Sequence, residues 1–414
     1  MIYVHVPFCR SFCTYCDFYS EVAARCRKAD DITRQEALFD DFAQALAGEV
    51  RFRAGEIADE VNTLYIGGGT PSVLPLSAFQ VLLKALRDAG HVGPFDEFTV
   101  EVNPEDVVDK GPSYIEALLN MGVNRISMGV QSFDDSVLKF MNRRHDSAMA
   151  RKAYGMLEEA GVKNISIDLI FGLPQLSSSL WNETLEKALN ISSRGVLPQH
   201  VSSYQLSVEP GSMLARLVEK GAWSEASDEL CQEQYTALCK ALASAGYHHY
   251  EISNFAQPGF EARHNSAYWN HVPYVGFGPG AHSYISPEHS SALLEEDKRP
   301  HLRRWNQPDL QAYLKAAGTG DFASVCEGET LDADQLMMER LMLGLRTSAG
   351  LPESFLRAHC DASALTRALS AGHLVRVDCA IPHLAGPNAS LPEPYLRIPE
   401  SNFFISDSII SALV

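Results

Sequence analysis

Three cysteines stand close together near the start of the chain. Cys9, Cys13 and Cys16 have the spacing C-x3-C-x2-C. Soft thiolate ligands suit iron–sulfur clusters or zinc far better than they suit ions that prefer oxygen. Three thiolates on a four-iron cluster leave one iron without a protein ligand, and such an iron can bind a small molecule. The spacing therefore favours a reactive [4Fe–4S] site over a purely structural one.

Two other uses of these cysteines have to be weighed. Zinc is the first, because three cysteines and a histidine form a common structural site and His5 is near. Such a site usually draws ligands from two separated segments, whereas the remaining cysteines are scattered, at Cys26, Cys231, Cys239, Cys326, Cys360 and Cys379. A disulfide framework is the second, and it requires a secreted context for which the sequence gives no sign. An iron–sulfur cluster is preferred, and zinc stays the alternative.

The composition is that of an ordinary soluble globular protein. Of 414 residues, 46% are hydrophobic and 21% charged, and 34 basic against 52 acidic residues give a net charge of −18. This charge argues against nucleic-acid binding, which needs a basic face, but leaves room for a small anionic ligand held by a few arginines. Neither a signal peptide nor an apolar run near 18 residues is visible, so we expect a cytoplasmic protein that can still meet membrane proteins at the membrane surface.

The elements that must position the cysteines form a repeating pattern. Short β-rich runs alternate with amphipathic helical runs from residue 1 to about 284, as in βα units around a parallel sheet. One predicted helix carries Phe79, Leu82, Leu83 and Leu86 on one face. We predict strands at Ile2 to Val6, Thr63 to Ile66, Phe98 to Val102, Arg125 to Val130, Asn164 to Phe171 and His200 to Leu206. The expected fold is α/β, a partial (β/α)6 barrel of the TIM type.

Unusual residues follow these strands rather than precede them. They are Gly67 to Pro71, Asn103-Pro104, Gln131-Ser132, Gly172 to Pro174 and Ser207 to Pro210, and the cysteine loop follows the first strand. In a (β/α) barrel the carboxyl ends of the strands form the active face. We therefore expect these segments to converge on the cysteines.

The chain is predicted to have two domains. Residues 1–285 form the barrel core with the cysteine loop and the H-N-x-x-Y-W segment that begins at His264, and residues 286–300, rich in Pro, Ser and charge, form a linker or insertion. Residues 301–414 form a small mixed domain of winged-helix-like character, in which Met338, Leu341, Met342 and Leu345 mark an amphipathic helix.

Taken together, the motifs resemble a known family. The residues that carry the resemblance are the opening Y-x-H-x-P-F-C-x3-C-x2-C, Gly67 to Pro71, Glu101 to Pro104, Gly129 to Phe133, Asp168 to Pro174, His264 to Trp269 and Arg340 to Arg346. In this order they resemble the radical SAM proteins of the oxygen-independent coproporphyrinogen III oxidase group. More narrowly they resemble its HemW branch, the haem chaperones.

The resemblance implies a [4Fe–4S] cluster on the three cysteines, with S-adenosylmethionine (SAM) chelating the fourth iron. Tyr15 matches the position that packs on the adenine, although plain hydrophobic cover for the cluster would also explain it. Gly68, Gly69 and Thr70 match the segment that receives the methionine amino group, although a tight turn would also use glycine. Glu101 matches the residue that contacts the ribose hydroxyls, although it could be a solvated carboxylate.

Four further residues match positions that contact a first or a second SAM in the oxidases. They are Tyr3, Gln131, Arg143 and Asp168. For Arg143 a surface charge is an equal alternative. Asp168 is harder to explain otherwise, because it interrupts an apolar strand and a buried acid needs a partner.

A histidine outside the six strands is the candidate haem ligand. His264 opens the pattern H-N-x-x-Y-W, which resembles the signature associated with haem binding in the chaperone branch. A hydrogen-bonded core histidine is the alternative, and His282 is a second ligand candidate.

Two functions are compatible with these motifs. In the first, an enzyme cleaves SAM and decarboxylates coproporphyrinogen III. In the second, a chaperone binds haem and delivers it to haem-dependent respiratory apoproteins. The oxidases carry a further cysteine two residues after the third, where this chain has Phe18, and an N-terminal extension ahead of the cysteines. Both differences favour the chaperone and weaken the case for a second SAM.

Overall fold

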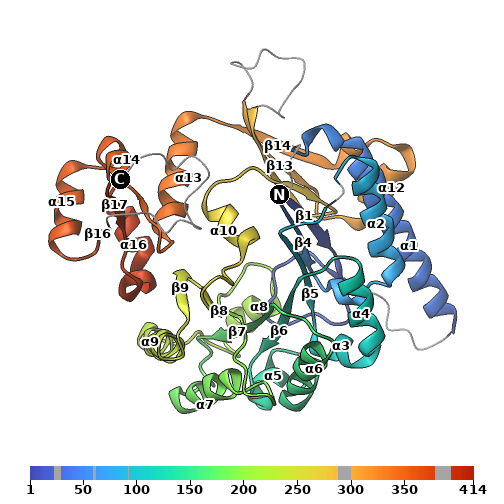
Figure 1. Ribbon diagram of the computed structural model, residues 1–414, viewed down its shortest axis with the longest axis horizontal. Coiled ribbons are helices and arrows are strands. Elements are labelled where there is room, and N and C mark those ends of the chain that lie inside the picture. The colour runs from blue at the N-terminus through green and yellow to red at the C-terminus, as the bar shows by residue number, and fades with distance from the viewer. Residues whose placement is uncertain (23–28, 59–61, 92, 288–299, 378–392) are drawn as a thin grey trace. The chain divides into compact units, whose positions relative to one another are not determined.

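The computed structural model describes residues 1–22, 29–58, 62–91, 93–287, 300–377 and 393–414 (Figure 1). These residues form two compact units. Unit 1 comprises Met1–Gln234 and Pro273–Thr330, and unit 2 comprises Tyr235–Val272 and Leu331–Val414. Cys26, Cys379 and most of the predicted linker at 286–300 lie outside the described residues. The predicted domain boundaries therefore stay a prediction.

Unit 1 is built on a parallel sheet. Its strands are β1 (Ile2–Val6), β4 (Thr63–Gly68), β5 (Glu97–Val102), β6 (Arg125–Gln131), β7 (Ile165–Phe171) and β8 (His200–Gln205). They pair in chain order, all parallel, and β11 (Val275–Phe277) adds a further parallel strand beside β1. The predicted α/β fold with a partial (β/α)6 barrel is confirmed, and each of its six strands lies within two residues of the predicted bounds.

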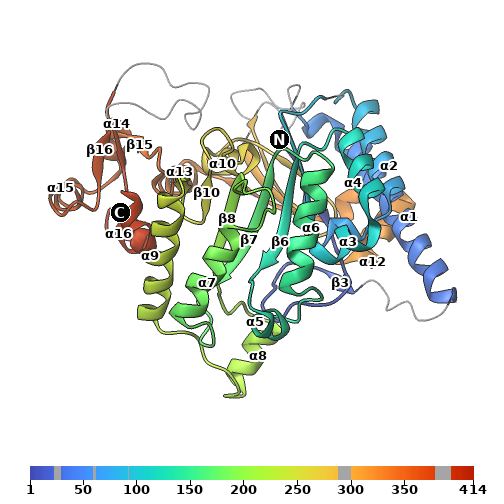
Figure 2. The same ribbon diagram turned by 60° about the horizontal axis from the view of Figure 1, so that its bottom comes forward.

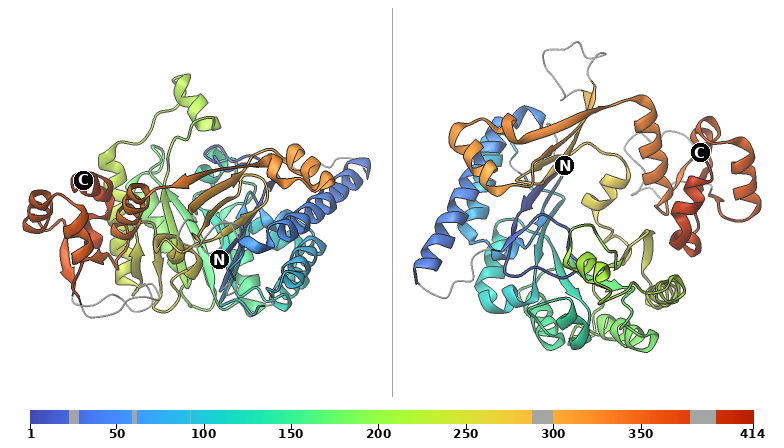
Figure 3. Two further views of the ribbon diagram at one scale, coloured as in Figure 1. Left: turned by 90° about the horizontal axis from the view of Figure 1, so that it is seen from above. Right: turned by 180° about the vertical axis from the view of Figure 1, so that it is seen from behind.

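Most helices of unit 1 cover the outer side of these strands. They are α1 (Ala29–Phe52), α2 (Leu76–Asp88), α3 (Pro104–Lys110), α4 (Pro112–Asn120), α5 (Asp135–Phe140), α6 (Ser147–Glu159), α7 (Ser178–Leu189), α8 (Met213–Glu219) and α12 (Leu310–Thr319). Figure 1 shows α2, α4, α6 and α7 following one another around the strands. The predicted apolar face of α2 is confirmed, since Phe79, Leu82, Leu83 and Leu86 are all buried. In contrast, α8 stands out from the sheet (Figures 2 and 3).

Side chains alternate along each strand, so every strand has an outer and an inner set. On β6, Ile126, Met128 and Val130 are buried apolar residues, while Arg125 and Ser127 of the other set are buried polar ones. Thr99 on β5 and Ser166 on β7 are likewise buried and polar. The barrel therefore has an apolar shell against the helices and a polar interior.

Three smaller sheets complete the described chain. In unit 1 the antiparallel strands β12 (His282–Ile285), β13 (His301–Asn306) and β14 (Cys326–Leu331) form one sheet, and the short strands β2 (Phe8–Cys9) and β3 (Glu21–Val22) pair at the cysteine loop. The helix α9 (Asp228–Ser244) begins in unit 1 and continues into unit 2. Within the described ranges, none of the helices combines the length and the apolar character that a membrane span needs.

Unit 2 is a mixed assembly of short helices and strands. It contains the hairpin β9 (His248–Glu251) and β10 (Asn254–Ala256), and the helices α10 (Arg263–Trp269), α13 (Ala333–Leu345), α14 (Glu353–His359), α15 (Ala362–Ser370) and α16 (Ser406–Ser411). A three-stranded antiparallel sheet has the order β15 (Leu351–Pro352), β17 (Tyr395–Arg397), β16 (Val375–Val377). Tyr250, Ala256, Ala262 and Ala349 pack together in its core. The predicted helix is α13, but only half of its predicted apolar face is covered: Leu341 and Leu345 are fully buried, whereas Met338 and Met342 are exposed.

Candidate functional site

The three cysteines lie on a loop that is closed at its base. Cys9 is the last residue of β2, which pairs with β3 and so brings the two ends of the loop together. All three thiols are free and half-buried. The loop follows β1, so it lies at the carboxyl ends of the parallel strands, as predicted for the active face of such a barrel.

The loop is anchored to neighbouring elements by polar contacts. Thr14 donates hydrogen bonds from its amide and its hydroxyl to two carbonyls at the end of α5. Asn142 donates from Nδ2 to the carbonyl of Phe12 at 2.6 Å. Arg10 forms an ion pair with the buried carboxylate of Asp106, with 2.8 Å between Nε and Oδ1. These contacts fix the loop through the side chains and carbonyls of the protein itself.

A chain of hydrogen bonds joins two of the cysteines through three strand-end residues. Thr70 Oγ1 donates to Cys9 Sγ at 3.5 Å, and Asn103 Nδ2 donates to Thr70 Oγ1 at 3.2 Å. Arg143 in turn donates to Asn103 Oδ1 at 2.6 Å and to Cys13 Sγ at 3.5 Å. The structure thus brings the predicted residues Thr70 and Arg143 onto the cysteine sulfurs. Asn103 belongs to one of the sequence motifs, but the sequence alone gives it no role.

The donor set fits an iron–sulfur cluster. Burial raises the pKa of the Cys9 thiol and raises that of Cys16 to about 12, so both would hold protons unless positive charge replaced them. In a four-iron cluster each thiolate binds a different iron, so the sulfurs need not converge on one point. By contrast, no group of three His, Cys, Asp or Glu in the described part of the chain is placed to hold a single metal ion.

The glycines after β4 are required by the cysteine loop itself. A Cβ on Gly69 would lie 2.8 Å from the carbonyl oxygen of Phe8 and 3.1 Å from Cys9 Sγ. Gly68 has a φ of 105°, and a Cβ there would lie 2.6 Å from the ring of His5. The close approach expected from the glycine run is therefore made by the protein itself, between these glycines and residues of β1 and β2.

Two carboxylates lie inside the barrel near this loop. Glu101 accepts hydrogen bonds from Tyr65 Oη at 2.5 Å and from the amide of Gly68 at 3.1 Å. Burial, together with the negative charge of Asp168, raises the pKa of Glu101 to about 7. Asp168 accepts from Ser127 Oγ at 3.2 Å, and burial raises its pKa to about 6. Both carboxyl groups can accept hydrogen bonds from the hydroxyl groups of a ligand. Nothing in the sequence distinguishes Tyr65 as the partner of Glu101.

The other predicted SAM contacts lie on β1, in the cysteine loop and at the end of β6. Tyr3 on β1 is hydrogen bonded through its hydroxyl to His5 Nδ1 at 3.0 Å. Tyr15 is half-buried, and burial together with the neighbouring Cys13 raises the pKa of its hydroxyl well above the usual range. Gln131 ends β6 with a φ of 66°, next to an irregularity in the pairing with β7. A positive φ at a non-glycine residue is costly and is found most often at functional sites.

The residues of the H-N-x-x-Y-W pattern lie on α10 in unit 2. His264 is buried, and its Nε2 lies 3.0 Å from the hydroxyl of Tyr268, one helical turn later. Asn265 donates from Nδ2 to Oε1 of Glu251 at 3.3 Å. Burial raises the pKa of Glu251 to about 7, and hydrogen bonds from Asn254 and Asn265 counteract this. The helix is therefore tied to β9 through a buried carboxyl group.

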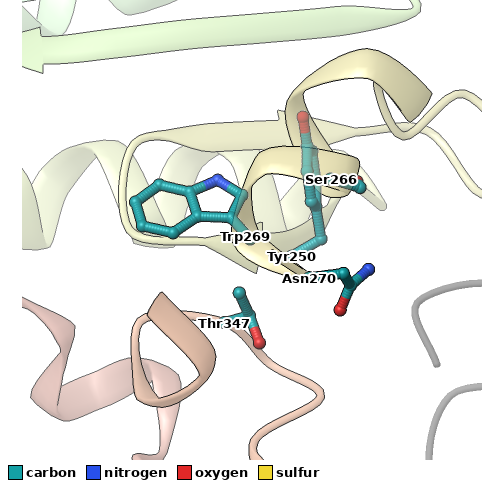
Figure 4. Close-up of a pocket in the computed structure, with 5 residues that line it drawn as sticks. All are labelled: Tyr250, Ser266, Trp269, Asn270 and Thr347. Carbon is teal, nitrogen blue, oxygen red and sulfur yellow. The ribbon is translucent and has the colours of Figure 1, made fainter. Parts of the chain in front are cut away.

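A small pocket opens beside this helix (Figure 4). It is lined by Tyr250, Ser266, Trp269, Asn270 and Thr347. Its volume of about 190 Å³ includes open solvent, so the enclosed space is smaller still. Ser266 Oγ and Trp269 Nε1 are buried and have no hydrogen-bond partner within the described residues. The pocket suits a small polar group and is too small for a whole porphyrin.

The second histidine candidate, His282, lies in unit 1. It is exposed on β12, and its ring stacks on Trp305 of β13 with centroids 5.9 Å apart.

Known proteins resemble this chain over most of its length. The model of the radical SAM superfamily matches residues 3–188. Heme chaperone HemW of Lactococcus lactis is 34% identical over 349 residues, which cover 84% of this chain and 82% of that protein. Heme chaperone HemW of Mycobacterium tuberculosis is 33% identical over 360 residues, covering 86% and 84%.

Two further comparisons extend the range. Radical S-adenosyl methionine domain-containing protein 1, mitochondrial, of Danio rerio is 30% identical over 387 residues, covering 91% of this chain and 81% of that protein. Among solved structures, coproporphyrinogen III oxidase (HemN) from Escherichia coli superposes with a TM-score of 0.74 over 99% of this chain and 89% of that one, at 21% identity, and so shares the fold. With the cysteine loop at the carboxyl ends of a partial barrel, these similarities show that the chain belongs to the radical SAM superfamily and, within it, to the family of the haem chaperone HemW.

Proposed function

We propose that this chain is a cytoplasmic haem chaperone that holds a [4Fe–4S] cluster and SAM, binds haem, and delivers it to haem-dependent respiratory apoproteins, including those at the membrane surface. The observation that carries the proposal is the similarity to proteins named heme chaperone HemW, at 31–34% identity over more than three quarters of their own length.

The cluster is assigned to Cys9, Cys13 and Cys16. Radical SAM proteins as a family use such a cluster with SAM, and when bound it supplies one-electron chemistry at the iron that has no thiolate. The hydrogen bonds from Thr70 and Arg143 to the sulfurs support this assignment, because hydrogen bonds to cluster ligands stabilise their negative charge.

SAM is assigned to the strand ends around the loop. Glu101 is proposed to accept hydrogen bonds from the ribose hydroxyls, and Tyr15 to cover the adenine. Gly68, Gly69 and Thr70 are proposed to face the methionine group, with Tyr3, Gln131, Arg143 and Asp168 completing the site. Their convergence supports the proposal, since these residues come from five neighbouring strands and the segments that follow them.

Haem is assigned to unit 2, with His264 as axial ligand. Imidazole is a common ligand to haem iron. Because Nε2 of His264 lies 3.0 Å from the Tyr268 hydroxyl, ligation through this nitrogen requires that contact to open. His282, exposed on its strand, is the next candidate.

Phe18 separates this reading from that of an oxidase. It is 63% exposed and stands where the oxidases of the group carry a further cysteine. A phenylalanine can neither ligate a metal nor form a mixed disulfide, so the chemistry of that cysteine is absent from the described loop.

One experiment tests the proposal. Anaerobically reconstituted protein is incubated with SAM, a reductant and coproporphyrinogen III, and in parallel is titrated with haem. We expect a stoichiometric haem complex and no decarboxylated product. His264→Ala should shift the Soret band and weaken haem binding, whereas His373→Ala, an exposed histidine, should leave both unchanged. Decarboxylation of the substrate without a stable haem complex would favour the oxidase instead.

A further inference from the structure

A buried arginine lies inside the barrel of unit 1. Arg125 is the first residue of β6, faces Thr99 of β5 in register, and is 3% exposed. Its Nε finds no hydrogen-bond partner among the described residues. Burying a guanidinium costs several kcal/mol unless nearby charge compensates for the lost water. An apolar side chain of similar length would fill the same space without that cost, so the charge itself requires an explanation.

Arg125 lies on the same inner face of the sheet as both carboxylates of the candidate SAM site. Ser127, two residues further along β6, is level with Glu101 in the register of β5 and β6 and donates to Asp168 Oδ1 at 3.2 Å. Burial is the main influence on Glu101 and Asp168 and raises the pKa of each, and their mutual repulsion adds to the rise for Glu101. The positive charge of Arg125 lowers both pKa values, and for Asp168 it is the strongest of the opposing influences. Two carboxylates that share a buried space cannot both ionise easily without such a cation.

Other charged and titratable groups face this space from every strand of the barrel. They are Tyr3 on β1, Tyr65 on β4, Glu97 on β5, His200 on β8, and Arg143 in the segment after β6. Burial keeps the two tyrosines protonated and His200 neutral. The Arg143 guanidinium already donates to Asn103, Gly129 and Cys13. Arg143 also lowers the pKa of Asp168, so two cations balance the acids, and Arg125 is the one that acts on both Glu101 and Asp168.

We propose that Arg125 is a positioning residue whose buried guanidinium keeps Glu101 and Asp168 ionised, so that their oxygens accept hydrogen bonds from the hydroxyl groups of the bound nucleoside. This inference rests on the proposed binding of SAM. It adds to that proposal a residue that lies two positions before the level of Glu101 in the register of the sheet. Arg125 acts through the carboxylates and does not touch SAM itself.

The test is the pH dependence of SAM binding, measured by equilibrium dialysis on anaerobically reconstituted protein between pH 5.5 and 9.5. In the wild type, affinity should rise as pH passes about 7, the pKa of Glu101. In Arg125→Met that rise should move upward by at least about one pH unit, which makes binding at pH 7 about tenfold weaker and lets the two proteins converge near the alkaline limit. Arg125→Lys, which keeps the charge, should follow the wild type within about threefold.

Controls separate charge from packing. Arg87→Met removes an exposed arginine from α2 and should leave the profile unchanged. A loss of affinity in Arg125→Met that is equal at every pH would overturn the proposal in favour of a packing role. An unchanged profile would also overturn it.

A second comparison keeps the proposal testable if Arg125→Met does not fold. Asp168→Asn removes the repelling neighbour, and the rise in affinity should move to lower pH. The double variant Arg125→Met/Asp168→Asn removes a cation and an anion together, and its rise should lie at least about one pH unit above that of Asp168→Asn. Coincidence of these two profiles would contradict the role of Arg125.

Failure of the inference can be told apart from failure of the proposed function. If reconstituted wild-type protein binds no SAM, the proposed site is wrong. The same variants are then compared by infrared titration of their protonated carboxyl groups, which needs no ligand. Protonated carboxyl should persist to higher pH in Arg125→Met than in the wild type, and identical titrations would overturn the inference.

Discussion

Replacing Glu101 by glutamine should stabilise the protein that lacks SAM. The pKa of this carboxyl rises from an ordinary value of 4.5 to about 7 in the folded chain, mainly because of burial. Between these two values the folded state binds more protons than the unfolded state, so ionisation of Glu101 lowers stability as pH rises through this window. At 1.36 kcal/mol per pH unit the cost above pH 7 is about 3 kcal/mol.

Glu101→Gln removes this cost while preserving the local contacts. The amide oxygen can accept from the amide of Gly68, and the amide nitrogen can donate to the hydroxyl oxygen of Tyr65. We therefore expect the variant to match the wild type near pH 5 and to be more stable by about 1–3 kcal/mol at pH 8. SAM binding should meanwhile weaken by about 1–3 kcal/mol, because a charge-assisted acceptor is lost.

The assay is urea denaturation of reconstituted protein without SAM, followed by circular dichroism at pH 5, 6.5 and 8. A gain of 2 kcal/mol should raise the midpoint by at most about 0.7 M, because a chain of this size has a slope of about 3 kcal/mol/M or more. Glu116→Gln, an exposed acid on α4, is the matched control and should show no pH-dependent difference. Equal destabilisation of Glu101→Gln at all three pH values would refute the argument, since it would mean that the carboxylate stabilises the fold.

Three further outcomes follow from the contacts of unit 1. Gly69→Ala places a Cβ against the cysteine loop and should at least halve the iron retained after reconstitution, measured as iron per chain. The control Gly55→Ala, whose Cβ would have nothing within 4 Å, should retain the iron of the wild type. Thr70→Val removes a hydroxyl that donates to Cys9 Sγ, so the cluster potential should become more negative in a redox titration, and Thr70→Ser should restore it. Arg53→Met leaves the buried Glu49 without its cation, while Glu56 keeps its ion pair with Arg304, and should cost about 3–5 kcal/mol in urea denaturation; a loss below about 1 kcal/mol would contradict this.

The strands could be predicted from the sequence because their signal is local. Each is a short β-rich run bounded by turn residues, and glycines such as Gly122 and Gly161 end the preceding helices with the positive φ expected of a left-handed cap. The convergence of the strand ends follows from the parallel topology alone. The sequence therefore suffices to predict that the cysteine loop, Thr70, Glu101 and Asp168 lie at one end of the sheet.

The supporting residues could not be predicted because their roles depend on contacts across strands. Tyr65 is one aromatic residue in an apolar run, and its hydrogen bond to Glu101 exists only once β4 and β5 pair. Asn103 bridges Thr70 and Arg143, which are far apart in the chain. The short spacing of a motif carries no information about such partners.

Arg125 illustrates why a propensity-based reading fails at the site. On sequence grounds an arginine at the start of a strand is a solvated charge, since arginine is seldom fully buried. In the fold Arg125 shares the barrel interior with Glu101, Asp168 and His200. The charged forms of these three side chains are less stable there than in water. A barrel interior filled with leucine and valine would be more stable, as the interiors of many such barrels are. Where a fold departs this far from its most stable packing, the departure itself marks the ligand site. The polar interior is thus an argument for a bound polar ligand that does not depend on any motif.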